Sequence, residues 1–190
     1  IKGKKPDAVF YGGMDATAGP LLKQARELGI QVPFAFGDGG CTDKMAEFAG
    51  TMAEGMLCSQ AGIPVQAANK KFLDAYKARF KMDPILYGPF TYDATNLLIA
   101  AMQKAGSSDP AKYLPALASI SLEGATGHLE FDAKGDRKDA EMTIFTVKAG
   151  KITPLAIVKS GKLIKYEDFI KPATAPTTPT LPTTPADGKK

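Results

Sequence analysis

The chain has 190 residues, of which 44% are hydrophobic, and its formal net charge at pH 7 is +4. That length allows one large domain or two small lobes, and the hydrophobic fraction is sufficient for a packed core. The lysines are scattered, whereas nucleic-acid binding needs a concentrated basic face, so we expect no nucleic-acid partner. The longest apolar run, at residues 97–102, is much shorter than the ~18 residues of a membrane span, and the first residues show no secretory signal pattern.

The first third of the chain alternates between predicted strands and helices. Pro20 fits the first turn of the first helix, and Gly29 ends it. This β-α-β-α-β order predicts a parallel sheet covered by helices. We expect buried strands at residues 7–12, 32–36 and 55–58, and helices at 17–28 and 43–48.

Helices predominate after Gly62. We expect an amphipathic helix over 65–80 with Phe72, Tyr76 and Phe80 on one face. A second helix is expected over 89–104 and a third over 110–119, the second burying a stripe of Phe90, Ala94, Leu97 and Ala101. Short strands follow at 124–127, 129–131, 142–147 and 152–158, with a hairpin turn at Ala149-Gly150.

Prolines and threonines dominate the chain from Lys171 onward. Such a composition offers few side chains that could be buried in a core. We therefore expect residues 171–190 to form an extended, disordered tail or linker.

Two of the predicted strands end in glycine-rich loops that carry a carboxylate, Gly37-Asp38-Gly39-Gly40 and Gly12-Gly13-Met14-Asp15. Ligands of open α/β sheets bind outside the carboxyl ends of the strands. We therefore expect the two loops to form one edge of a cleft, with Asp38 as its charged contact. The competing interpretation of Asp38 is a turn-forming residue between glycines.

The sequence offers little for metal binding or catalysis. Cys41, Cys58 and the single His128 are too few for a structural zinc site, so no metal is expected. The two cysteines form either one disulfide or two buried thiols, and composition leaves both open. Residues 132–136 faintly resemble a calcium loop but lack its bidentate Glu, which favours a solvated turn. His128 is expected at the surface or in a hinge, without a catalytic role.

The motifs of common α/β enzymes are also missing from the sequence. We find no G-x-S-x-G elbow, no Walker loop and no G-x-G-x-x-G that opens a helix. No catalytic residue and no cofactor are therefore expected.

An ordered set of segments resembles the periplasmic leucine/isoleucine/valine-binding proteins. The resemblance runs from about residue 2 to 165 and implies the type I periplasmic-binding-protein fold. That α/β fold has two doubly wound parallel-sheet lobes that close on an amino acid, and this chain would be its incomplete C-terminal portion. The segments are residues 6–13 and 19–29, Gly37-Asp38-Gly39, residues 53–56, Tyr92-Asp93-Ala94 and residues 127–136.

The resemblance also implies how the chain is divided between the lobes. The chain would cross between them near residues 59–63 and 141–146, and the N-terminal half of the protein, with its signal peptide, would be missing. Residues 1–60 would belong to the second lobe, 61–144 to the first, 145–170 to the second again, and 171–190 to the tail.

Four residues acquire a ligand-binding role from the resemblance. Asp38 would neutralise the ligand's ammonium group, at a position where the family often has Glu. Met14 stands where some members carry an aromatic residue over the ligand, and Tyr87 and Tyr92 lie where aromatics approach the cleft from the first lobe. Simple packing is the competing interpretation for these three. Asp15 is expected to be the N-cap of the following helix, in preference to the alternative of a ligand contact.

The function implied is that of a periplasmic substrate-binding component of an ABC-type importer. It would capture a free amino acid, branched-chain or otherwise neutral, and pass it to a membrane permease. The alternatives are a ligand-sensing receptor ectodomain of the same fold and an α/β enzyme that uses Asp38. Because periplasmic export supplies oxidant, and because Cys41 and Cys58 follow strands that should be neighbours, we expect these cysteines to form a disulfide.

Overall fold

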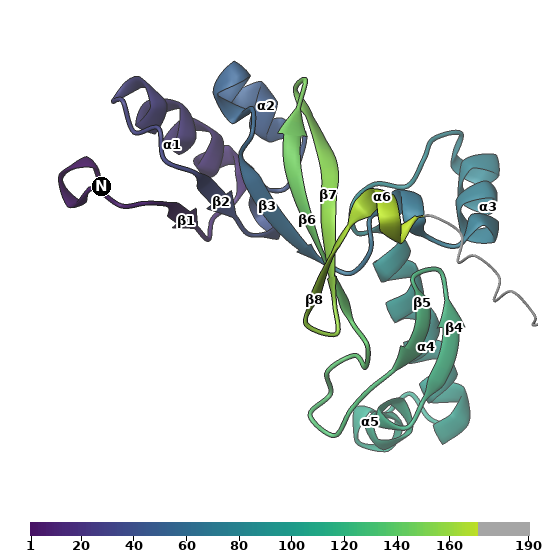
Figure 1. Cartoon of the computed structure of the whole chain (residues 1–190). Helices are drawn as coiled ribbons and strands as arrows, with labels where there is room; N and C mark the ends of the chain where they lie inside the picture. Colours follow the sequence, from purple (N-terminus) through teal and green to yellow (C-terminus); the bar gives the residue numbers. More distant parts are fainter. Residues whose placement is uncertain (171–190) are drawn as a thin grey trace, which may run out of the picture.

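The computed structural model describes residues 1–170, so the predicted tail at 171–190 lies outside the described residues. The elements form two units that lie side by side (Figure 1). The sheet unit contains β1–β3, β6–β8 and helices α1, α2 and α6, and the helical unit contains α3–α5 and the hairpin β4–β5.

The sheet unit is built on six strands in the order β1-β2-β3-β6-β7-β8. Strands β1, β2 and β3 pair in parallel, which confirms the predicted β-α-β-α-β order, and α1 and α2 connect them. β6 then pairs antiparallel with β3, and β7 and β8 continue antiparallel. The bounds are β1 (Val9–Tyr11), α1 (Asp15–Glu27), β2 (Phe34–Phe36), α2 (Lys44–Ala49), β3 (Leu57–Ala61), β6 (Glu141–Lys148), β7 (Lys151–Lys159), β8 (Lys162–Lys165) and α6 (Tyr166–Phe169).

The predicted turn at Ala149-Gly150 is confirmed between β6 and β7. Both residues have positive φ, 51° and 73°, as a two-residue hairpin turn requires. Their backbone N–H groups donate to the carboxylate of Glu54 at 3.1 and 2.7 Å. β8 and α6, by contrast, were not predicted from the sequence.

The start of α1 differs from the prediction. The N–H groups of Thr17 and Ala18 both donate to the carbonyl of Met14, so Met14 is the N-cap and Asp15 is the first helical residue. The prediction of Asp15 as N-cap is therefore wrong, and Pro20 lies inside the helix rather than in its first turn. Asp15 is instead engaged in a tertiary contact, in which its Oδ2 accepts from the Thr42 hydroxyl at 2.7 Å.

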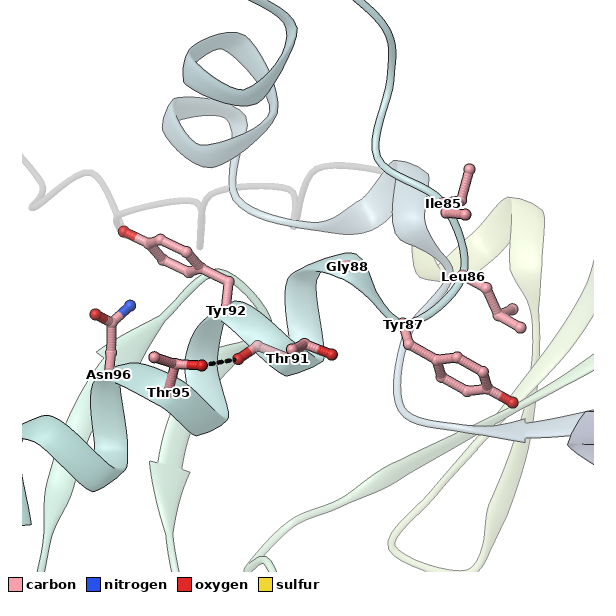
Figure 2. A pocket seen from close by; sticks show the side chains of 8 residues that line it. All are labelled: Ile85, Leu86, Tyr87, Gly88, Thr91, Tyr92, Thr95 and Asn96. Atoms are coloured by element: carbon pink, nitrogen blue, oxygen red, sulfur yellow. Dashed lines mark hydrogen bonds between the residues drawn. The ribbon is translucent and has the colours of Figure 1, made fainter. Parts of the chain in front are cut away.

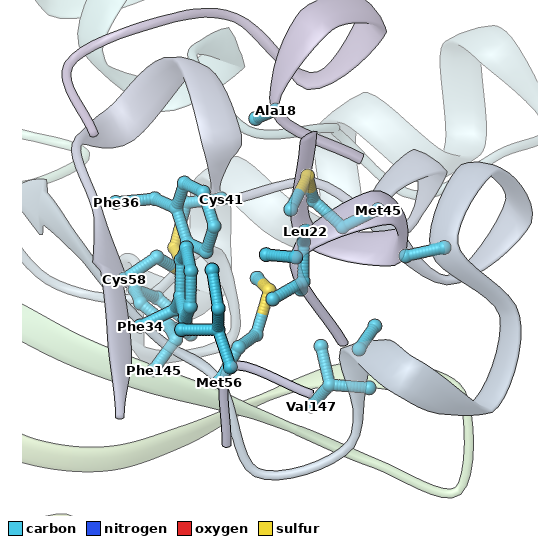
Figure 3. Close-up of a cluster of buried hydrophobic side chains, with 14 residues drawn as sticks. Ala18, Leu22, Phe34, Phe36, Cys41, Met45, Met56, Cys58, Phe145 and Val147 are labelled. Carbon is cyan, nitrogen blue, oxygen red and sulfur yellow. A yellow bond between two sulfur atoms is a disulfide. The ribbon is translucent and has the colours of Figure 1, made fainter. Parts of the chain in front are cut away.

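A hydrophobic core fills the space between the sheet and its helices (Figure 3). Cys41 and Cys58 form a disulfide within this core, with their Cα atoms 5.4 Å apart, and both residues are buried. α1 and α2 approach closely at Gly19, where a Cβ atom would lie 2.4 Å from Phe48. The fully buried side chains include Ala18, Leu22, Phe34, Phe36, Met45, Met56 and Val147.

The helical unit comprises α3 (Lys70–Phe80), α4 (Gly88–Ala105), α5 (Pro110–Ala118), β4 (Ser121–Gly124) and β5 (Gly127–Glu130). The predicted helix over 65–80 is interrupted, because a 3-10 turn at Val65–Ala67 ends before Asn69 caps α3 through the N–H of Lys71. The strand predicted at 124–127 is wrong, since these residues form the turn of the β4–β5 hairpin.

Asp93 replaces Ala94 in the buried stripe of α4. Ala94 is exposed, whereas Asp93 is only 3% exposed and lies against the hairpin turn. Its carboxylate accepts from the N–H groups of Ala125 and Thr126 and from the Thr126 hydroxyl, at 2.6 to 2.8 Å. A Cβ atom on Gly124 would lie 2.6 Å from this carboxylate, so the hairpin fits against α4 only with glycine there.

The predicted aromatic face of α3 exists, but it is not buried. The rings of Phe72, Tyr76 and Phe80 contact one another in sequence, with centroids 5.8 and 4.6 Å apart. No residue of α3 is buried, and Phe80 is 55% exposed. The Phe72 ring also packs against Tyr92 of α4, 5.0 Å away.

The chain passes between the units after β3 and returns before β6. Gly62, just after β3, donates its N–H to the carbonyl of Glu141, and its own carbonyl accepts from the buried Thr143 hydroxyl, each at 2.6 Å. Gly62 has φ +86°, and a Cβ atom there would lie 2.4 Å from the Phe90 ring of α4. This crossing therefore requires glycine for both its backbone angle and its packing.

Reduction of the disulfide should lower the free energy of unfolding by about 3 kcal/mol, because the bridge closes the segment between Cys41 and Cys58 into a loop and so restricts the unfolded chain. Chemical denaturation of oxidised and reduced wild-type protein measures the difference without altering any side-chain volume. Two reactive thiols in unfolded, unreduced protein would contradict the bridge itself.

The Asp93→Asn variant should be less stable by about 1.5–3 kcal/mol, because the amide loses the charge-assisted bonds and turns a donor toward backbone N–H groups. Asp74→Asn is the matched control, because Asp74 pairs with Lys70 on the exposed surface of α3. Its effect should stay below about 0.5 kcal/mol. Equal denaturation midpoints for Asp93→Asn and Asp74→Asn would refute the structural role of Asp93.

Candidate ligand-binding site

Asp38 projects from a tightly packed loop at the end of β2. Residues Asp38–Gly40 form a 3-10 turn in which Asp38 is exposed, whereas Gly39, Gly40 and Cys41 are buried. A Cβ atom on Gly40 would lie 2.8 Å from Phe36, so the backbone itself packs against the end of the sheet. The loop therefore presents one carboxylate to solvent.

Three contacts hold this loop to neighbouring elements. The disulfide joins Cys41 to β3, and the buried Gln60 side chain of β3 donates to the Cys41 carbonyl at 2.9 Å. The Thr42 hydroxyl donates to Asp15 of α1 at 2.7 Å. No sequence motif marks Gln60 or Thr42, because both act through residues distant in the chain.

Met14 lies beside the Asp38 loop. A Cβ atom on Gly39 would come within 2.5 Å of the Met14 sulfur and 3.1 Å of the Gly13 carbonyl. The loops after β1 and β2 are therefore adjacent, as the parallel pairing of these strands predicts. Met14 is 64% exposed, so its apolar side chain remains accessible.

Tyr87 contacts Asp38 from the helical unit. Tyr87 is the N-cap residue of α4, and its hydroxyl donates to Oδ2 of Asp38 at 3.2 Å, while Oδ1 accepts from the N–H of Gly39 at 2.9 Å. Partial burial raises the pKa of Tyr87, and the negative charge and hydrogen bond of Asp38 raise it further. The contact joins residues 49 positions apart and links the two units.

A cavity of about 650 Å³ lies beside the first turns of α4. Figure 2 shows Tyr87 and Tyr92 pointing away from each other, Tyr87 toward the sheet unit and Tyr92 to the opposite side. Tyr92 is 52% exposed and packs on Phe72, so it does not join the Asp38 contact. The lining residues are Ile85, Leu86, Tyr87, Gly88, Thr91, Tyr92, Thr95 and Asn96.

The structure thus brings three of the four predicted site residues together. Asp38, Met14 and Tyr87 are neighbours, and Tyr92 lies apart along the cavity. Half or more of each of Met14, Tyr87 and Tyr92 is exposed, so none of them is a core residue. An exposed carboxylate beside apolar and aromatic side chains can bind a cationic group attached to an apolar body.

Other residues considered from the sequence lie elsewhere. His128 belongs to β5, is exposed, and contacts the Glu123 side chain. Asp132 accepts from the N–H groups of Lys134 and Asp136, which makes residues 132–136 a turn, as predicted. Within residues 1–170 no cluster of His, Cys, Asp and Glu could hold a metal ion, and no helix is long and apolar enough to cross a membrane.

Comparison with known proteins identifies the family. The profile of the periplasmic binding proteins matches residues 1–151. The leucine-, isoleucine-, valine-, threonine- and alanine-binding protein of Pseudomonas aeruginosa is 32% identical over 138 residues, which are 72% of this chain and 37% of that protein. The Leu/Ile/Val-binding protein of Citrobacter freundii is 37% identical over 149 residues, covering 76% of this chain and 39% of that protein.

Solved structures show the same fold over a larger share of this chain. A leucine-binding protein from Thermotoga maritima superposes with a TM-score of 0.72 at 27% identity, covering 88% of this chain and 47% of that one. A branched-chain amino acid transporter substrate-binding protein from Streptococcus pneumoniae, in complex with isoleucine, gives 0.66 at 28% identity, covering 84% and 46%.

The chain spans only about two fifths of the length of these curated relatives and about half of these solved structures. The chain therefore corresponds to part of the architecture of those solved structures. Because the profile match covers residues 1–151 and solved members share its α/β fold, the chain belongs to the periplasmic binding protein family.

Proposed function

We propose that the protein containing this chain is the substrate-binding component of an ABC-type importer in the periplasm. It captures a free amino acid, branched-chain or otherwise neutral, and delivers it to a membrane permease. The observation that carries the proposal is the exposed Asp38 carboxylate. Its loop is held by a disulfide, and Tyr87 of the other unit donates a hydrogen bond to it. The binding specificities of the similar proteins named above support the choice of amino acid.

Asp38 supplies the recognition of the ligand's ammonium group. A charge-assisted hydrogen bond between an ammonium and a carboxylate is stronger than a neutral one, and apolar neighbours that exclude water strengthen it further. Met14 covers the Asp38 loop, and the cavity beside Tyr87 and Tyr92 offers an apolar wall from Ile85 and Leu86. This combination suits a ligand with one cationic group and an aliphatic side chain.

The two units are assigned to the two lobes of the complete protein. In this proposal residues 1–60 and 145–170 form part of the second lobe and residues 61–144 form part of the first, so both boundaries fall inside the paired strands β3 and β6 of the sheet unit. The crossings after β3 and before β6 support this division. Groups that hold the ligand's carboxylate would come from the part of the protein that this chain does not span.

In the full-length protein, Asp38→Asn should weaken amino-acid binding by about ten- to hundredfold, because it removes the charge of a charge-assisted bond and keeps its shape. Titration calorimetry with leucine, isoleucine and valine measures the affinities. The control is Asp7→Asn, which neutralises an exposed carboxylate before β1 and should leave binding unchanged. Wild-type affinity in Asp38→Asn would refute this role.

The isolated 190-residue chain should bind these amino acids weakly or not at all. It supplies the ammonium partner but not the carboxylate partners, and burying an unpaired ligand carboxylate costs several kcal/mol. Exposed apolar side chains such as Phe10 on edge strand β1 and Phe80 on α3 are surfaces that the remaining half would cover.

Calorimetry on the isolated chain, with and without the remaining half added in trans, tests this expectation. Addition of that half should raise both the affinity for amino acids and the melting temperature. Micromolar or tighter binding by the isolated chain would show that the site is complete without it.

A further inference from the structure

We infer that Tyr87 is a positioning residue for Asp38: its hydroxyl fixes the orientation of the carboxylate that receives the ligand's ammonium group. The inference rests on the proposed function and assigns Tyr87 a role distinct from direct contact with the ligand. It starts from the hydrogen bond of 3.2 Å between the Tyr87 hydroxyl and Oδ2 of Asp38.

The backbone of the Asp38 loop is already fixed, so the remaining freedom lies in the Asp38 side chain. The disulfide and the Gln60 hydrogen bond hold Cys41, and the flanking Gly39 is buried. The terminal torsion of an exposed Asp is broad, so a fixed loop alone does not orient the carboxylate plane. A donor on each oxygen does orient it.

Both Asp38 oxygens have such a donor. Oδ1 accepts from the N–H of Gly39 at 2.9 Å, and Oδ2 accepts from the hydroxyl of Tyr87. A carboxylate has about four acceptor positions, so two donors leave room for an ammonium group. The phenol is a neutral donor, so it orients Asp38 and leaves its negative charge in place. A Lys or Arg in the same position would cancel that charge.

The tyrosine is itself held by a rigid element. Its carbonyl accepts from the N–H of Thr91 in the first turn of α4, and the preceding turn is closed by the bond from Gly88 N–H to the Ile85 carbonyl. The buried Pro89 anchors the same turn. The orientation of Asp38 in the sheet unit therefore depends on where the start of α4 lies, so affinity for the ligand is coupled to the arrangement of the two units.

A phenolate titration tests the contact on this chain, without any ligand. The absorbance difference between wild type and Tyr87→Phe isolates the titration of Tyr87, whose pKa should lie above the usual value. Asp38→Asn should move that pKa downward, because the phenolate then no longer faces a negative charge. A Tyr87 titration that does not respond to Asp38→Asn would show that the two side chains are not in contact, which overturns the inference.

A double-mutant cycle in the full-length protein, with L-leucine as probe, tests the role in binding. Tyr87→Phe should weaken affinity about three- to tenfold, less than the loss of the Asp38 charge, because the carboxylate remains but is no longer held in one orientation. The same change should have little further effect in the Asp38→Asn background, because Tyr87 acts through Asp38. The control Tyr76→Phe removes a hydroxyl from the α3 aromatic face and should leave affinity unchanged.

The outcomes separate the inference from the proposed function. Equal losses from Tyr87→Phe in both backgrounds would mean that Tyr87 contacts the ligand directly, which overturns the inference. Wild-type affinity in Tyr87→Phe alone would also overturn it. If Asp38→Asn binds leucine like wild type, the proposed function fails instead, and the phenolate titration still decides whether Tyr87 and Asp38 are in contact.

Discussion

The covalent bond between Cys41 and Cys58 is the constraint on which the Asp38 loop at the edge of the sheet unit depends. The loop after β2 contains Gly37, Gly39 and Gly40, which have no side chains to hold it in place. The bridge from Cys41 to β3 supplies that restraint. The buried Gln60 side chain adds a second link, because it donates a hydrogen bond to the carbonyl of Cys41. The backbone of the glycines can therefore pack against Phe36 and Met14, and the backbone of Asp38 between them is held in a fixed position.

In the helical unit, a buried charge holds a turn in place. Asp93 ties the β4–β5 turn to α4 through three hydrogen bonds, and such bonds are what make a buried carboxylate tolerable. Removal of either side of this contact would leave polar groups unpaired. The requirement for glycine at position 124 follows from the same approach of hairpin and helix.

Local patterns predicted the parts of the fold that local chemistry determines. The parallel order of β1–β3 and the Ala149-Gly150 turn could both be derived from residues close in sequence. The errors arose where a residue distant in the chain determines the environment of a side chain. Asp15 contacts Thr42, and Asp93 rather than Ala94 faces the core. The Asp38–Tyr87 contact joins residues 49 positions apart, and no periodicity predicts it. Sequence reasoning could therefore nominate both residues but not their contact.

The paired crossing at Gly62 has a mechanical consequence. β3 and β6 are hydrogen-bonded along their length, and the bond between Gly62 and Glu141 extends the pairing to the point where the chain leaves the sheet unit. β6 is also paired with β7 at this point, so three strands stay hydrogen-bonded up to the crossing. Such a segment of sheet resists shear within its plane, because shear breaks the hydrogen bonds between its strands, but it bends more easily out of that plane. The connection is therefore most compliant to bending out of the sheet plane, and the Phe90 ring against Gly62 lies where bending toward α4 would meet resistance.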